Sequence, residues 1–145
     1  MKGRLSCPIF WALVGTFVVI VSGMTIAAFI PAFRGSTFLW FITSSGAIFF
    51  LLGAALIFFT VKEKVRGMPK KFLLLTGASA VGFLLFILLH NAVYGLFSYF
   101  FGADFWDRVG LGDEPFFFIM AIFVCPIGFS VGAVGRIVLF IKTRQ

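Results

Sequence analysis

The side chains that could bind a ligand or transfer a proton are few in this sequence, and most follow one histidine. His90 is the only histidine among 145 residues, and Asn91, Tyr94, Asp104 and Asp107 follow it. An imidazole near such groups is a candidate for haem ligation, quinone binding or proton transfer. One histidine cannot supply both axial ligands of a bis-histidine haem within one chain, so that site requires a second chain. The simpler interpretation is a histidine that hydrogen-bonds a neighbour and holds no ligand.

The sequence contains no further pattern typical of a catalytic or metal site. Cys7 and Cys125 form no Cys-x-x-Cys motif, and the acidic residues of 104–114 do not match the spacing of a calcium loop. A Ser-His-Asp set, a glycine-rich phosphate loop and a zinc-binding HExxH motif are also missing. The sequence therefore predicts a protein that is not an enzyme and binds no metal or cofactor.

A second pattern, of small residues at helical spacing, suits helix packing. In the last apolar segment these residues fall on one face of a helix and form a stripe: Ala121, Cys125, Gly128 and Gly132. Gly82 and Gly23 indicate similar faces in two other segments. Small residues let helix backbones approach closely in lipid. The stripe predicts packing within a bundle or contact with a partner helix, and we favour packing within the bundle because several helices must pack together.

The composition determines which elements must position these residues. Hydrophobic residues make up 61% of the chain and charged residues 12%, against about 45–50% and about 25% in soluble domains. This excludes a soluble domain, a disordered chain, a coiled coil and a nucleic-acid-binding domain. Four charge-free runs, 5–33, 35–61, 72–103 and 115–135, each exceed the about 20 residues that cross a bilayer as a helix.

The apolar residues in these runs are continuous and do not alternate with polar ones, which favours helices over membrane strands. We therefore predict an all-α fold: a single domain forming an integral membrane bundle of four transmembrane helices, at about 7–31, 37–61, 71–93 and 115–141. An outer loop is expected over 95–114. Within these helices, Ser6 is expected to cap the first, Glu114 and Pro115 to begin the fourth, and Pro126 to kink it.

The orientation follows from the basic residues, which are enriched in cytoplasmic loops. Ten of the twelve lie on one predicted side: Lys2, Arg4, Lys62, Lys64, Arg66, Lys70, Lys71, Arg136, Lys142 and Arg144. Arg34 and Arg108 lie on the other side, as do four of the five acidic residues. We therefore expect both termini to be cytoplasmic, in a multi-pass protein of the cell membrane.

Three classes of function agree with these features. The first is a non-catalytic accessory subunit or interaction protein in a membrane complex, favoured by short loops, small-residue faces and spans without Asp, Glu or Lys. The second is a small channel or transporter that works as an oligomer, and the third is a haem- or quinone-linked redox anchor using His90. The expected partners are the lipid bilayer and either other membrane proteins or further copies of the chain, and nucleic acid is not among them.

Overall fold

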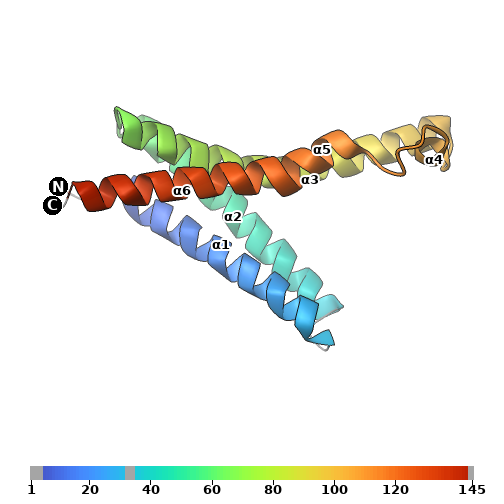
Figure 1. Cartoon of the computed structure of the whole chain (residues 1–145), viewed down its shortest axis with the longest axis horizontal. Coiled ribbons are helices and arrows are strands. Elements are labelled where there is room, and N and C mark those ends of the chain that lie inside the picture. The colour runs from blue at the N-terminus through green and yellow to red at the C-terminus, as the bar shows by residue number, and fades with distance from the viewer. Residues whose placement is uncertain (1–4, 32–34, 144–145) are drawn as a thin grey trace.

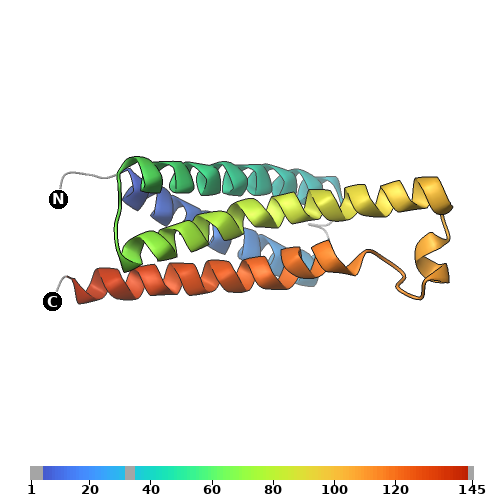
Figure 2. The ribbon, with the colours of Figure 1, turned by 90° about the horizontal axis from the view of Figure 1, so that it is seen from above.

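The computed structural model describes residues 5–31 and 35–143, and all regular structure within them is helical. The elements are α1 (Ser6–Phe29), α2 (Ser36–Lys62), α3 (Met68–Phe101), α4 (Phe105–Arg108), α5 (Pro115–Ile119), a π-helical turn η2 (Met120–Val124) and α6 (Cys125–Lys142). Figures 1 and 2 show that α5, η2 and α6 form one continuous rod. Four helices are long and apolar enough to span a membrane, counting Pro115–Lys142 as one. The prediction of an all-α protein with four membrane helices is confirmed.

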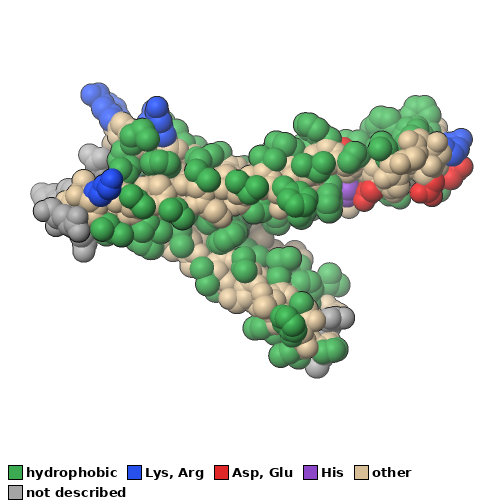
Figure 3. All heavy atoms as spheres, viewed as in Figure 1, with side chains coloured by type: hydrophobic (Ala, Val, Ile, Leu, Met, Phe, Trp, Pro, Cys, Tyr) green, Lys and Arg blue, Asp and Glu red, His purple; other side chains and the backbone are tan. Residues whose placement is uncertain are grey.

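The four long helices form two hairpins that separate toward one end of the molecule. In Figure 1, α1 and α2 run side by side, as do α3 and α6. The two hairpins meet over the half where α1 begins and α6 ends, and they diverge toward the opposite half (Figure 1). Most of the described lysines and arginines gather at the first end, and most acidic residues, with His90 and Arg108, at the second (Figure 3). We call these the basic end and the acidic end.

The start of α1 and the end of α6 both lie at the basic end of the bundle (Figure 2). Which side faces the cytoplasm stays a prediction. Four of the basic residues on which it rests lie outside the described residues: Lys2, Arg4, Arg34 and Arg144.

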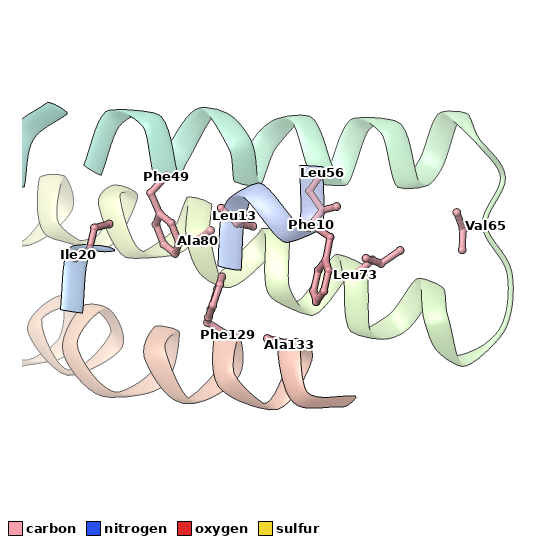
Figure 4. Close-up of a cluster of buried hydrophobic side chains, with 10 residues drawn as sticks. All are labelled: Phe10, Leu13, Ile20, Phe49, Leu56, Val65, Leu73, Ala80, Phe129 and Ala133. Atoms are coloured by element: carbon pink, nitrogen blue, oxygen red, sulfur yellow. The ribbon is translucent and has the colours of Figure 1, made fainter. Parts of the chain in front are cut away.

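The core lies where the hairpins meet, and all four membrane helices contribute to it (Figure 4). Its buried members are Phe10, Leu13, Ile20, Phe49, Leu56, Val65, Leu73, Ala80, Phe129 and Ala133. The ring of Phe129 lies 4.5 Å from that of Phe17 and 5.2 Å from that of Phe49, measured between centroids. Lipid tails are as apolar as these side chains, so close packing rather than escape from water must hold the helices together.

Small residues bring α2 and α3 into close contact. A Cβ atom at Gly53 would lie 2.8 Å from Cβ of Ala80, and one at Gly77 would lie 2.8 Å from Cγ1 of Ile57. Neither position has room for a methyl group without a shift of its neighbour. The two helices can therefore approach along this line only because these residues are glycine.

The helix α2 ends at Lys62 because the backbone two residues later takes a left-handed conformation. Lys64 adopts a left-handed φ of 51°, and the N–H groups of Lys64 and Val65 donate to the carbonyls of Val61 and Thr60 at 3.0 and 3.2 Å. This is the Schellman arrangement, which satisfies the last carbonyls of a helix. The following Val65 is buried, and it anchors the turn that leads to α3.

The predicted capping role of Ser6 is wrong, because Ser6 already lies within the first turn of α1. Its N–H donates to Oε1 of Glu63 at 3.4 Å, and its hydroxyl donates to Oε2 at 2.6 Å. A carboxylate from the end of α2 therefore satisfies the start of α1. This contact ties the first hairpin together at the basic end.

Next to Pro126 the fourth membrane helix contains a π-helical turn, which the sequence did not predict, while the predicted kink stays a prediction. The N–H of Cys125 bonds the carbonyl of Met120, five residues earlier, and regular α-helix resumes from Cys125 onward. Proline has no N–H to donate to Ile122, and a π turn is one way in which a helix absorbs that missing bond.

Candidate functional site

The small-residue stripe of the fourth membrane helix faces α3. A Cβ atom at Gly132 would lie 2.5 Å from Oγ1 and 2.8 Å from N of Thr76, and 3.0 Å from the carbonyl oxygen of Phe72. One at Gly128 would lie 2.6 Å from Oγ of Ser79. Gly132 is therefore buried and Gly128 half-buried against α3 of the same chain.

The other predicted packing residues lie in related places. Cys125 and Gly82 oppose each other across the same interface, where a Cβ atom at Gly82 would lie 3.1 Å from Sγ of Cys125. Ala121 is 1% exposed and belongs to η2, which also packs on α3. Gly23 belongs to the first hairpin, where the ring of Phe41 from α2 occupies the space that a side chain would need.

His90 lies on α3 beside the start of the fourth membrane helix. Its Nδ1 is 3.0 Å from the main-chain carbonyl oxygen of Glu114 and 3.4 Å from Oε2 of the same residue. A carbonyl oxygen can only accept, so Nδ1 carries the hydrogen in this bond. Nε2 then lies 3.7 Å from Oδ2 of Asp113, and the imidazole packs against the ring of Phe118 with centroids 5.7 Å apart.

Glu114 is the centre of this cluster and is only 5% exposed. Its Oε1 accepts from the N–H of Phe116 at 2.9 Å and its Oε2 from that of Phe117 at 3.0 Å, so Glu114 is the N-cap of the helix whose start the sequence placed here. Its own N–H donates to Oδ1 of Asp113 at 2.7 Å. A buried carboxylate with these donors is well stabilised, and it fixes the first turn of the fourth membrane helix against His90 on α3.

The structure does not bring the other predicted polar residues to His90. Asn91 donates to the carbonyl of Ile87 in its own helix at 2.8 Å. Asp104 pairs with Arg108 at 3.3 Å, and Asp107 belongs to the same short helix α4. Among the residues that the structure describes, no three His, Cys, Asp or Glu side chains gather as metal ligands.

Sequence reasoning missed the pairing of His90 with Glu114. The signal that could have found this pairing is the predicted depth in the membrane, since both residues were placed at the outer ends of consecutive spans. This arrangement joins α3 to the fourth membrane helix and satisfies the first N–H groups of that helix, so its role is structural.

Tyr94 carries a second feature, which we call the arm: residues 95–109, comprising the last turns of α3 and all of α4. Trp106 is 7% exposed, stacks on Tyr94 with ring planes 9° apart, and donates from Nε1 to the Tyr94 carbonyl at 3.2 Å. Phe97 contacts the rings of Phe101, Phe105 and Trp106. These rings hold α4 against α3.

A reversal of the chain at Gly102 makes this packing feasible. Gly102 ends α3 with a φ of 100°, a value that side-chain-bearing residues rarely adopt. Arg108 returns from α4 to donate to the carbonyl of Phe101 at the end of α3. The arm is therefore a folded extension of α3 and not an open loop.

Another side of the arm is apolar and uncovered. Tyr99 is 82% exposed, Phe100 67% and Leu96 53%. We call these three residues the aromatic ridge. The sequence predicted an outer loop from residue 95, but α3 continues to Phe101, and the aromatic rings of the arm divide into a packed set and an exposed set.

Comparisons with protein-family models, with curated proteins and with solved structures give no match for this chain.

Proposed function

We propose that this protein is a non-catalytic accessory subunit that binds another membrane protein through its arm. The observation that supports this proposal is the aromatic ridge, which is exposed on a helix longer than the membrane is thick. The proposal concerns a stoichiometric complex in the membrane, in which this chain contributes binding surface and no chemistry.

The length of α3 supports a position of the ridge outside the hydrocarbon. Its 34 residues extend over about 51 Å, and a bilayer with its headgroups measures about 40–45 Å. Counting about 20 residues from Phe72, at the basic end, the hydrocarbon ends near Asn91, and Tyr99 lies about 12 Å beyond it. Exposed apolar surface is ordinary inside lipid, but a contiguous patch at or beyond the headgroups is typical of a protein interface.

Neighbouring charges suggest the chemistry of the partner. Asp104, Asp107 and Asp113 lie at the same end of the molecule as the ridge, where Figure 3 shows acidic side chains beside apolar ones. Complementary charge and a buried aromatic centre are common features of protein interfaces. We therefore expect a partner whose outer surface carries an apolar pocket bordered by lysine or arginine.

The bundle interior favours this proposal over conduction through a single chain. Where the hairpins meet, the rings of Phe17, Phe49 and Phe129 pack together, at centroid distances of 4.5 to 6.1 Å. A pore needs a polar or water-filled path, and stacked phenylalanines close one. A channel formed between several copies is the alternative, and the test below separates it.

The test combines co-purification with site-specific photo-crosslinking in native membranes. A photoreactive phenylalanine replaces Tyr99, and the same group replaces Val131 as a control, since Val131 is 53% exposed in the middle of the fourth membrane helix. We expect a partner in fixed stoichiometry, crosslinked from position 99 and not from 131. The double variant Tyr99→Ala, Phe100→Ala should lose this partner without a change in thermal stability, because both side chains are exposed.

Three outcomes would overturn the proposal. Adducts of lipid alone at position 99 would place the ridge in the headgroup layer. Adducts with further copies of this chain, and with nothing else, would favour the oligomeric channel. A haem absorption band in the purified complex that is lost in His90→Ala would favour the redox anchor.

A further inference from the structure

An open groove of about 540 Å³ lies between α2 and α3 toward the basic end. Its lining residues are Ala54, Ile57, Phe58, Val61, Lys62 and Val81. All of them are apolar except Lys62, which stands at the end of the groove nearest the α2–α3 connection. The volume falls within the range of about 300–1,000 Å³ that small-molecule sites occupy.

Lys62 has no acidic partner among the described residues. Its Nζ lies 5.5 Å from the ring centre of Phe58 and 5.9 Å from that of Phe59. The adjacent carboxylate of Glu63 is engaged by Ser6 on α1. The ion pairs of the described chain involve His90 and Arg108, both at the acidic end. The aliphatic stem of Lys62 therefore lines the groove, and its ammonium group lies beside the rings of Phe58 and Phe59 at that end, without a described carboxylate as partner.

We propose that this groove binds one anionic phospholipid of the surrounding bilayer, with the phosphate at Lys62 and an acyl chain along Ala54 to Val61. Lys62 ends α2, and Ala54 lies eight residues deeper, about 12 Å along the helix axis. This distance fits within one leaflet, whose hydrocarbon is about 15 Å deep. The groove thus offers a charge at headgroup level and an apolar channel below it, as a phospholipid requires.

The neighbouring charges favour an anionic over a zwitterionic headgroup. Lys64, Arg66, Lys70 and Lys71 follow Lys62 within the connection to α3 and its first turn. Basic clusters between membrane helices attract anionic lipid headgroups, and each lysine near the surface adds to the attraction. Beside the groove, the close approach at Gly53 and Gly77 fixes the distance between α2 and α3.

The experiment is native mass spectrometry of the protein released from nanodiscs that contain equal amounts of phosphatidylglycerol and phosphatidylcholine. We expect one retained phosphatidylglycerol per chain. Lys62→Gln should lower its occupancy about fivefold. Ala54→Leu should fill the groove and lower the occupancy of either lipid. The matched controls are Lys142→Gln, which removes an exposed charge at the same end, and Ala92→Leu, which enlarges an exposed alanine elsewhere; both should retain the lipid.

An equal loss of bound phosphatidylglycerol in Lys62→Gln and Lys142→Gln would overturn the proposal, because it would show a diffuse attraction to the basic surface and no specific site. Equal retention of the two lipids would overturn the charge selectivity. Unchanged retention in Ala54→Leu would show that the acyl chain lies elsewhere. If Ala54→Leu does not fold, Val61→Phe fills the same groove from a position that is 57% exposed. This site is separate from the arm, so its failure leaves the proposed function untouched, and the reverse also holds.

Discussion

Gly132→Ala adds one methyl group where the backbones of the fourth membrane helix and α3 approach closely. The new Cβ would lie 2.8 Å from the backbone nitrogen of Thr76 and 3.0 Å from the backbone oxygen of Phe72. A rotamer change cannot move backbone atoms, so the two helices must separate. The hydroxyl of Thr76, 2.5 Å from the same Cβ, is itself bonded to the Phe72 carbonyl at 2.8 Å and is not free to swing away.

The expected cost follows from comparison with Gly128→Ala. At Gly128 the close atom is Oγ of Ser79, the end of a rotatable side chain, at 2.6 Å. Overpacking of a rigid site costs about 1–3 kcal/mol, while alanine gains up to about 1 kcal/mol over glycine in a helix. We therefore expect Gly132→Ala to lower the free energy of unfolding by about 1–2 kcal/mol and Gly128→Ala to leave it nearly unchanged.

The assay is equilibrium unfolding of the purified monomer in mixed micelles, followed by far-ultraviolet circular dichroism. Gly132→Leu should destabilise more strongly than Gly132→Ala, and Ile119→Leu, at a position 49% exposed, should change stability by less than about 0.5 kcal/mol. Equal stabilities of Gly132→Ala and Gly128→Ala would refute the distinction between backbone and side-chain neighbours. Unchanged stability of the monomer in Gly132→Leu would refute the packing of this face within the chain.

Four further predictions follow from single positions. Thr60→Val should raise stability by about 1 kcal/mol in the same unfolding assay, because the Thr60 hydroxyl is buried without a hydrogen-bond partner in the described structure; a loss would contradict this. Lys64→Gly should raise it by a similar amount, since glycine adopts the left-handed conformation without strain. Glu114→Ala should cost about 1–2 kcal/mol through loss of the N-cap, and Glu114→Gln less, since its amide oxygen still accepts. A cytoplasmic reporter should be active when fused after Gln145 and inactive within 104–113; the opposite pattern would reverse the orientation.

The spans are predictable from the sequence because hydrocarbon offers no hydrogen-bond partners to the backbone. A charge-free run must satisfy its backbone internally, so it forms a helix whatever its side chains pack against. The start of the fourth membrane helix is predictable for a local reason, since Glu114 followed by Pro115 supplies an acceptor and a first-turn residue with no N–H to satisfy. These rules need no knowledge of the tertiary structure.

The end of α3 was not predictable from bilayer thickness. The thickness of the bilayer sets only the minimum length of a transmembrane helix, so the sequence-based estimate ended this span at about residue 93. The helix continues to Phe101, because Phe97 and Phe101 pack against Phe105 and Trp106. The predicted loop over 95–114 is in consequence shorter, and it begins at Gly102.

The polar contacts between helices were also not predictable, because they join residues far apart in sequence. Ser6 and Glu63 are separated by 57 positions, and His90 and Glu114 by 24. In a soluble bundle an apolar stripe would tell which faces meet. Here every face is apolar, because lipid and core favour the same side chains, so that periodicity carries little information.

Small residues replace the apolar stripe as the marker of a packing face, but they do not show how far the contact extends. Gly46 and Gly53 are seven residues apart and share one face of α2. A methyl group at Gly53 would collide with Ala80 of α3, whereas one at Gly46 would have no atom of another helix within 4 Å. Between these two lies Phe49, which packs with Phe129 in the core where the hairpins meet, and Gly46 belongs to the half of α2 where they diverge (Figure 1). The face of α2 is thus encoded in its own sequence, while the length of the contact is set by the crossing of the two hairpins, a property that no single helix contains.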